Sequence, residues 1–222
     1  MSNRLASASR VVAISLALLA GCSSLKGKES GERYTAPDGL FSVPVPKLAR
    51  GQRTEDRVET NPETNLRAGA VAFTDDFASI RAIEYDRIPP GYEASEDMMR
   101  SHLHDKRLPY IQKFSPQARV AREEPVRLSD GTSAWFAVLE IPEGSNLIQK
   151  SPQHPDGRRL DSVRGFLLVG REDLFLVLNA ADDFGRKEGE GATPEETEKL
   201  KSTLLALYSS IVFNPSARAA GS

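Results

Sequence analysis

The stretch FLLVGREDLFLVLNA, residues 166–180, decides the fold class. It consists of two nearly continuous apolar runs on either side of the polar tetrapeptide GRED, residues 170–173. Apolar runs of this length, bounded by turn residues, are typical of central strands that other elements cover. The pattern predicts an antiparallel hairpin in the middle of a sheet, with arms at residues 161–169 and 174–180.

Other strand patterns lie on both sides of this hairpin. AWFAVLEI, residues 134–141, is the strongest of them. In GLFSVPVP, residues 39–46, apolar and polar positions alternate, and the two prolines favour an edge strand. Residues 46–66 are mostly polar and receive no assignment. The remaining predicted strands are 120–128, and a hairpin of 69–74 with 79–88 around Asp75 and Asp76.

Two helices complete the pattern. Ser95 is a good cap for a helix that carries Met98, Met99 and Leu103, and Pro109 should end or kink it. The second helix begins with the capping box TPEE, residues 193–196. Its apolar stripe must be buried, and the sheet is the obvious partner. The stripe consists of Leu200, Leu204, Leu207, Tyr208 and Ile211.

The order of strand, hairpin, helix, hairpins and terminal helix predicts an α+β fold. We expect an antiparallel sheet packed against helices, including the amphipathic C-terminal helix. GLFSVPVP, AWFAVLEI, FLLVGREDLFLVLNA and KLKSTLLALYSSIVF together resemble the Mog1/PsbP-like fold, which many bacterial lipoproteins share. The resemblance covers residues 34–213. It implies a fold and no active site, because the fold hosts unrelated functions.

The N-terminal residues have the features of an export signal. Arg4 and Arg10 precede an apolar run of ten residues, 11–20. A membrane-spanning helix needs about 20 apolar residues, whereas the apolar region of a signal peptide has about 7–15. The run is therefore expected to belong to a signal peptide at residues 1–21.

Leu19-Ala20-Gly21-Cys22 contains the single cysteine and resembles the lipobox of bacterial lipoproteins. The resemblance implies cleavage before Cys22, a diacylglycerol on its thiol and acylation of the new amino group. Several acyl chains make a durable membrane anchor. Ser23, rather than Asp, follows the cysteine, which in enterobacterial lipoproteins implies export to the outer membrane. The alternative is an ordinary signal peptide with a leftover cysteine.

The mature chain divides simply. We expect a flexible tether at residues 22–33, one α+β domain at 34–213 and a disordered tail at 214–222. The full chain of 222 residues has a net charge of −2, and loss of Arg4 and Arg10 makes it −4, with 27 basic and 31 acidic residues. This balance offers no basic excess of the kind that a nucleic-acid-binding protein uses to neutralise phosphates.

Few residues suggest a catalytic or metal-binding role. His102 and His104 form an HxH pair beside Asp105, but on a helix the two imidazoles point about 200° apart and cannot share a metal ion. His154 is expected to be a solvated loop residue. We predict no catalytic residue, no metal ligand and no cofactor.

Several other motifs are expected to be structural. The acidic pairs Asp75-Asp76, Glu123-Glu124 and Asp182-Asp183 most simply solvate turns, although a calcium site at the last is conceivable. GRKEGEGAT, residues 185–193, lacks the lysine position of a phosphate loop and resembles a mobile surface loop. Core positions are expected for Met98, Met99 and Trp135.

Two functional hypotheses follow. The first is a lipid-anchored, non-enzymatic interaction or structural module in the periplasm, which contacts an envelope protein or the cell wall through loops 142–159 and 182–192. The second is a small-ligand-binding protein or enzyme with a cleft near His102, His104 and Asp105. Converging side chains around a concave pocket would support the second hypothesis, and diverging ones would exclude it.

Overall fold

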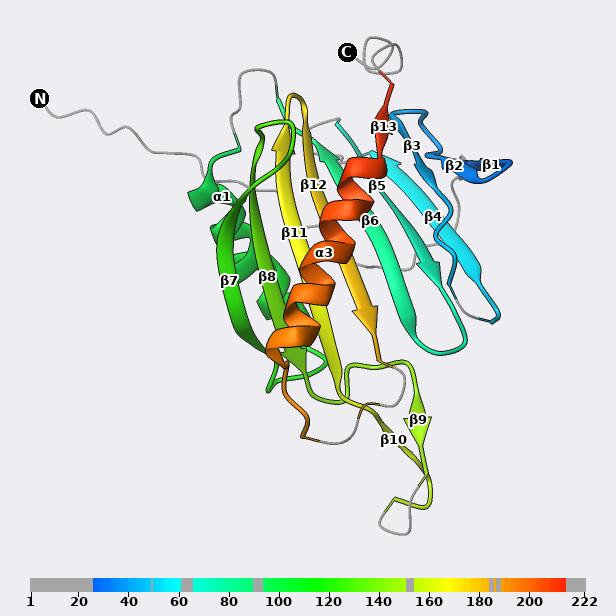
Figure 1. Ribbon diagram of the computed structural model, residues 1–222, viewed down its shortest axis with the longest axis vertical. Helices are drawn as coiled ribbons and strands as arrows, with labels where there is room; N and C mark the ends of the chain where they lie inside the picture. The colour runs from blue at the N-terminus through cyan, green and yellow to red at the C-terminus, as the bar shows by residue number, and fades with distance from the viewer. Residues whose placement is uncertain are drawn as a thin grey trace, which may run out of the picture.

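A seven-stranded antiparallel sheet is the centre of the molecule (Figure 1). The computed structural model describes residues 26–48, 50–60, 66–89, 94–150, 154–183, 186 and 189–214. The predicted α+β class with an antiparallel sheet is confirmed. None of the helices in these ranges is both long and apolar enough to cross a bilayer. In spatial order the strands are β4 (Arg53–Thr60), β5 (Arg67–Thr74), β6 (Ser79–Arg87), β12 (Leu174–Asp182), β11 (Ser162–Arg171), β8 (Ser133–Ile141) and β7 (Arg119–Arg127).

The predicted central hairpin is confirmed as β11 and β12. Arg164 to Arg171 of β11 pair with Ala181 to Leu174 of β12, and Leu167 lies opposite Leu178. β8 flanks β11 and β6 flanks β12, so neither arm is an edge strand. Leu167 and Leu178 pack in one core, whereas Phe166 and Val177 pack in a second core on the opposite face. The apolar runs are continuous because both faces of these strands are buried.

α3 (Pro194–Ser210) covers the first face of the sheet, as predicted. The Thr193 hydroxyl caps it by accepting a hydrogen bond from the Glu196 N–H at 3.1 Å. The helix lies so close to β11 that a Cβ on Gly165 would be 3.0 Å from Leu204 Cδ1. The predicted stripe is buried: Leu200, Leu204, Leu207, Tyr208 and Ile211.

A small second sheet packs beside α3 on this face, in the order β1 (Lys28–Ser30), β2 (Arg33–Thr35), β3 (Phe41–Pro44) and β13 (Val212–Phe213). It corrects two expectations. Residues 28–33 were expected in a flexible tether, but they form β1 and the start of β2. β3 was expected at an edge, yet it lies between β2 and β13, because the chain returns after α3 to pair Val212 with Ser42.

A helical segment covers part of the second face. It runs through α1 (Glu96–His102), the π-helical turn η1 (Leu103–Arg107) and α2 (Leu108–Gln112). Ser95 caps it as predicted, but Pro109 does not end it. The Leu108 N–H donates to the Leu103 carbonyl five residues earlier. Such a wide turn accommodates a proline ring, which would crowd the carbonyl of a regular α-helix.

Three strands lie in two segments where no strand was predicted. β4 falls within residues 46–66, where the polar sequence RTEDRVET gave no apolar pattern. β9 (Ile148–Gln149) and β10 (Arg158–Arg159) form a small hairpin within loop 142–159. The other predicted strands are confirmed at β5, β6, β7 and β8. The predicted signal peptide, Cys22 and residues 215–222 of the predicted tail lie outside the described residues.

The packing of α3 can be tested by truncating Leu204, which is completely buried between the helix and the sheet. We expect Leu204→Ala to lower the free energy of unfolding by about 2–5 kcal/mol, because it leaves a cavity in the core. Leu205→Ala is the matched control, since Leu205 is only partly buried. Urea denaturation should show a clearly larger loss for Leu204→Ala, and equal losses would contradict this packing.

Candidate interaction surface

The three residues proposed for a ligand cleft diverge. His104 Nε2 lies 2.9 Å from Glu123 Oε2 on β7. The His102 ring instead packs 4.8 Å from the Phe175 ring on β12, measured between centroids, and Asp105 is exposed. No group of three or more potential metal ligands occurs in the described ranges. The alternative hypothesis of one ligand cleft at His102, His104 and Asp105 therefore does not hold.

Two titratable groups on the second face have shifted pKa values. Burial, helped by the nearby Arg107 guanidinium, lowers the pKa of His102 to about 4, so its ring is neutral near pH 7. Burial next to the Glu84 carboxylate raises the pKa of Asp86 to about 7. Both shifts arise mainly from desolvation. They report how closely the chain is packed at this face and do not define a catalytic pair.

Residues of the three acidic pairs make hydrogen bonds that stabilise the fold. Asp75 accepts hydrogen bonds from the Phe77 and Ser79 N–H groups and shapes the β5–β6 turn. Glu124 accepts a hydrogen bond from Lys201 Nζ at 2.7 Å and so links β7 to α3. Asp182 accepts two hydrogen bonds from Arg81, at 3.0 and 3.1 Å.

The residues that were expected in the core differ in how deeply they are buried. Met99 is fully buried, as predicted. Trp135 is only half-buried, because its Nε1–H donates to Glu123 Oε2 at 3.1 Å at the edge of the second core. His154 is exposed, in line with the predicted solvated position.

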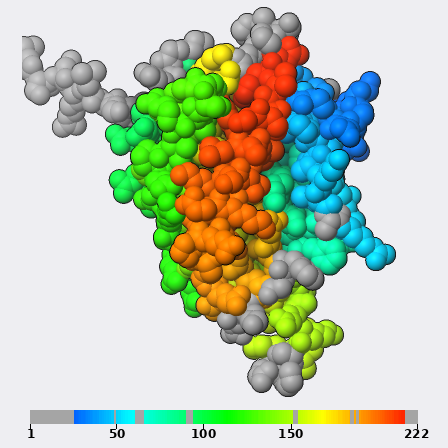
Figure 2. Space-filling view, viewed as in Figure 1, coloured from blue at the N-terminus to red at the C-terminus, as the bar shows by residue number. Residues whose placement is uncertain are grey.

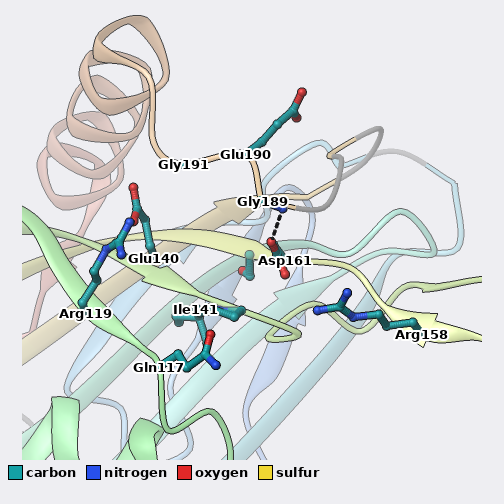
Figure 3. A pocket seen from close by; sticks show the side chains of 11 residues that line it. Gln117, Arg119, Glu140, Ile141, Arg158, Asp161, Gly189, Glu190 and Gly191 are labelled. Atoms are coloured by element: carbon teal, nitrogen blue, oxygen red, sulfur yellow. Dashed lines mark hydrogen bonds and ion pairs between the residues drawn. The ribbon is translucent and has the colours of Figure 1, made fainter.

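The two loops expected to contact a partner meet at one end of the sheet. Asp161 joins them (Figure 3): its Oδ1 accepts a hydrogen bond from the Glu143 N–H at 3.0 Å and its Oδ2 accepts one from the Gly189 N–H at 2.8 Å. One carboxylate therefore connects loop 142–159 to loop 182–192. The sequence did not single out Asp161, because nothing local indicates that two distant loops share it.

The described part of the glycine-rich loop is attached to the domain. The Ala192 N–H donates to Glu140 Oε1 at 2.8 Å. Arg186 forms an ion pair with Glu196 of α3, and its side chain is only 7% exposed. The expectation of a freely mobile loop therefore needs correction at Arg186, Gly189 and Ala192.

A polar cavity of about 310 Å³ lies between the joined loops (Figure 3). Ser162 lines it and donates a hydrogen bond at 3.0 Å to Asp183 Oδ1, which belongs to a fully buried carboxyl. Burial raises the pKa of Asp183. The cavity walls carry both signs of charge and include Gln117, Arg119, Glu140, Arg158, Asp161 and Glu190.

Two exposed apolar side chains belong to segments that contact residues lining this cavity. Phe114 is 76% exposed and Ile148 is 63% exposed. Phe114 precedes Ser115, whose hydroxyl donates to the carbonyl of the cavity residue Pro142 at 2.7 Å. Ile148 lies on β9, which pairs with the strand of the cavity residue Arg158. We call the cavity, these two side chains and the β9–β10 hairpin the loop end.

The loop end lies far from the first described residues. The β9–β10 hairpin projects beyond the sheet at one end of the long axis (Figures 1 and 2), whereas β1, β2 and β13 lie toward the other end. Aromatic and aliphatic side chains are enriched at the centre of protein contact surfaces, and polar groups surround them. The geometry therefore makes the loop end a candidate interaction surface.

Comparison with known proteins gives a fold likeness and no family. No family model and no curated protein matches the chain. A solved structure, the solution structure of cyanobacterial PsbP (CyanoP) from Synechocystis sp. PCC 6803, is similar with a TM-score of 0.47 and 13% identity. The match covers 90% of this chain and 99% of that chain. No residue role follows from a likeness at this identity.

The role of Asp161 can be tested by removing its carboxylate. We expect Asp161→Ala to speed amide hydrogen exchange in both loops, at Glu143 and Gly189, because each N–H loses its acceptor. Asp156→Ala is the control, since Asp156 is an exposed turn residue of the same region. Faster exchange in only one loop, or in neither, would contradict the joining of the loops.

The shifted pKa of Asp86 predicts a pH-dependent stability. Its value of about 7, against 3.8 for an unperturbed carboxyl, means that the folded state holds the proton more tightly than the unfolded state. Stability contributed by this group therefore falls as pH rises from about 4 to 7. Asp86→Asn should gain stability over the wild type between pH 5 and pH 8 in urea denaturation. If the difference in unfolding free energy between Asp86→Asn and the wild type were the same at pH 5 and pH 8, this result would contradict the raised pKa of Asp86.

Proposed function

We propose that the protein is a lipid-anchored, non-enzymatic interaction or structural module of the bacterial cell envelope. In this proposal the lipid is attached to Cys22, the body faces the periplasm, and the membrane is the outer membrane. The loop end is presented to another envelope protein or to the cell wall. The lipobox-like residues Leu19 to Cys22 support the anchor, and Ser23 supports the outer membrane.

The observation that carries the proposal is the joining of two loops by Asp161 at the end opposite the first described residues. A surface that contacts a partner should be held in one shape and should lie away from the membrane. The loop end combines both properties with the exposed side chains of Phe114 and Ile148. Pre-organised loops reduce the conformational entropy lost on binding.

With the lipid on Cys22, only a short linker would connect the membrane to the folded domain. The Gly27 N–H donates to Asp56 Oδ2 at 2.6 Å and so fixes the chain to the edge of the main sheet. From Cys22 to Gly27 the chain advances five residues, which span at most about 18 Å. β11 alone, with ten residues, extends over about 33 Å. The linker is therefore shorter than the sheet is long, which favours an orientation with β1 near the membrane.

The charge and the chemistry agree with this role. A mature net charge of −4 gives the body no general attraction to an anionic lipid surface. The titratable candidates that the sequence offered for catalysis, His102, His104 and Asp105, do not converge. We therefore favour binding over catalysis as the activity of this domain.

Replacing the proposed lipid attachment residue tests both parts of the proposal. In the native host, Cys22→Ser should move the protein from the detergent phase to the aqueous phase, because no acyl chain remains. A photo-reactive residue at position 148 should form a discrete cross-linked product in the lipidated protein and lose it in the Cys22→Ser background.

The controls are matched to these two readouts. Ser23→Ala retains the cysteine and should stay in the detergent phase. A photo-reactive residue at Ser202, which is exposed on α3, should give no discrete product. Detergent partitioning of Cys22→Ser would overturn the anchor. Equal products from positions 148 and 202 would overturn the loop end as the contact surface.

A further inference from the structure

The β9–β10 hairpin differs in charge from the rest of the molecule. It forms a two-stranded sheet of its own and projects beyond the main sheet (Figure 1). Residues 145–160 contain three cations, Lys150, Arg158 and Arg159, and one acid, Asp156. The mature chain as a whole has a net charge of −4. The hairpin is therefore a basic projection from an acidic body.

The register of the hairpin divides its side chains between two faces. Arg159 lies opposite Ile148, so these two side chains share one face. Arg158 precedes Arg159 and therefore lies on the other face. There its Nε–H donates to Glu143 Oε1 at 2.8 Å. The face with Arg158 is thus tied to the end of the main sheet, and the face with Ile148 is not.

Lys150 extends the face of Ile148. A Cβ on Gly157 would lie 2.5 Å from Ile148 Cγ2 and 3.6 Å from Lys150 Cγ, so both side chains stand beside the same bare backbone. We call Ile148, Lys150 and Arg159 the basic face. All three side chains are exposed, Ile148 by 63%. Neither cation forms an ion pair with another described residue, because the ion pair of this hairpin joins Arg158 to Glu143 on the other face.

We propose that the basic face binds an acidic segment of a partner envelope protein. An apolar side chain of that segment covers Ile148, and a carboxylate on each side of it pairs with Lys150 and Arg159. This inference rests on the proposed function, because the hairpin belongs to the loop end, and it adds the chemistry of the partner.

The distribution of charge favours this occupant. The acidic body repels an acidic segment, whereas the hairpin attracts it, so the field of the whole protein directs such a partner to the basic face. A basic partner would meet like charge at Lys150 and Arg159, and a neutral one would leave both cations unpaired. Burial of Ile148 adds an apolar contact between the two ion pairs.

The peptide acetyl-Glu-Ser-Leu-Ser-Glu-amide is a suitable probe, because an extended chain places both glutamates and the leucine on one side. In the isotope-labelled full chain, titration should produce saturable NMR shifts of the backbone N–H groups of residues 148–150 and 157–159. The double charge reversal Lys150→Glu/Arg159→Glu should weaken binding by about tenfold or more. Ile148→Ser should weaken it about fivefold by removing apolar contact area. These variants should fold, since the three side chains are exposed.

A matched charge reversal elsewhere makes the test specific. Lys28→Glu/Lys47→Glu changes the net charge by the same amount at two exposed lysines outside the hairpin, and it should leave binding unchanged. The basic peptide acetyl-Lys-Ser-Leu-Ser-Lys-amide should not bind. The proposal is overturned if the wild type gives no saturable shifts, if the two double variants bind equally, or if the basic peptide binds as tightly as the acidic one.

A cross-linking comparison in the native host separates this inference from the proposed function. The product formed from a photo-reactive residue at position 148 should disappear in the Lys150→Glu/Arg159→Glu background. A product that persists there would overturn the acidic partner and leave the loop end as the contact surface. Absence of a product from the wild type would instead count against the proposed function. Co-sedimentation with phosphatidylglycerol vesicles that the double reversal abolishes would make an anionic membrane the occupant and overturn the proposal.

Discussion

Burial of β11 and β12 on both faces is the constraint on which the rest of the structure depends. Two adjacent strands with apolar side chains on each side require one covering layer per face, which α3 and the helical segment supply. Antiparallel pairing then brings the end of β8, the start of β11 and the end of β12 to the same end of the sheet. The loops that follow β8 and β12 must therefore meet, and Asp161 lies where one carboxylate can reach both.

The sequence predicts best where one residue pattern determines one element. The runs of β11 and β12, the Thr193 cap and the Leu200 to Ile211 stripe each have a local signature, and all are confirmed. β4 has no such signature, because a polar edge strand that faces solvent needs no apolar alternation. The position of β3 depends on β13, which arrives from the far end of the chain. A local pattern cannot reveal a partner 170 residues away, as Val212 and Ser42 are.

The same distinction applies to the candidate surface. The polar composition of residues 142–159 and 182–192 marked both loops as exposed, but only the fold shows that they form one surface. Asp161 is one acidic residue in a polar stretch. Its role in joining the loops depends on the backbone N–H groups of both Glu143 and Gly189, which lie far from each other in the sequence. The HxH pair illustrates the opposite case. The helix points His102 and His104 in different directions, so His102 contacts Phe175 of β12 and His104 contacts Glu123 of β7.

The proposed function assigns different roles to the two ends of the domain. An anchor before Gly27 would hold the β1 end near the membrane, and the length of the sheet would carry the loop end away from it. In this arrangement the sheet forms the core of the domain and also separates the membrane from the partner, because the length of its strands sets the distance between them.

The most direct measurement is the depth of labelled positions in lipidated protein reconstituted into vesicles. Spin labels at positions 29 and 148 can be compared through their accessibility to lipid-dissolved oxygen and to a water-soluble relaxation agent. The account predicts that the label at 29, on β1, lies close to the headgroups. The label at 148 should lie roughly 30 Å or more from them, in water. Contact of the label at 148 with lipid would contradict the proposed orientation.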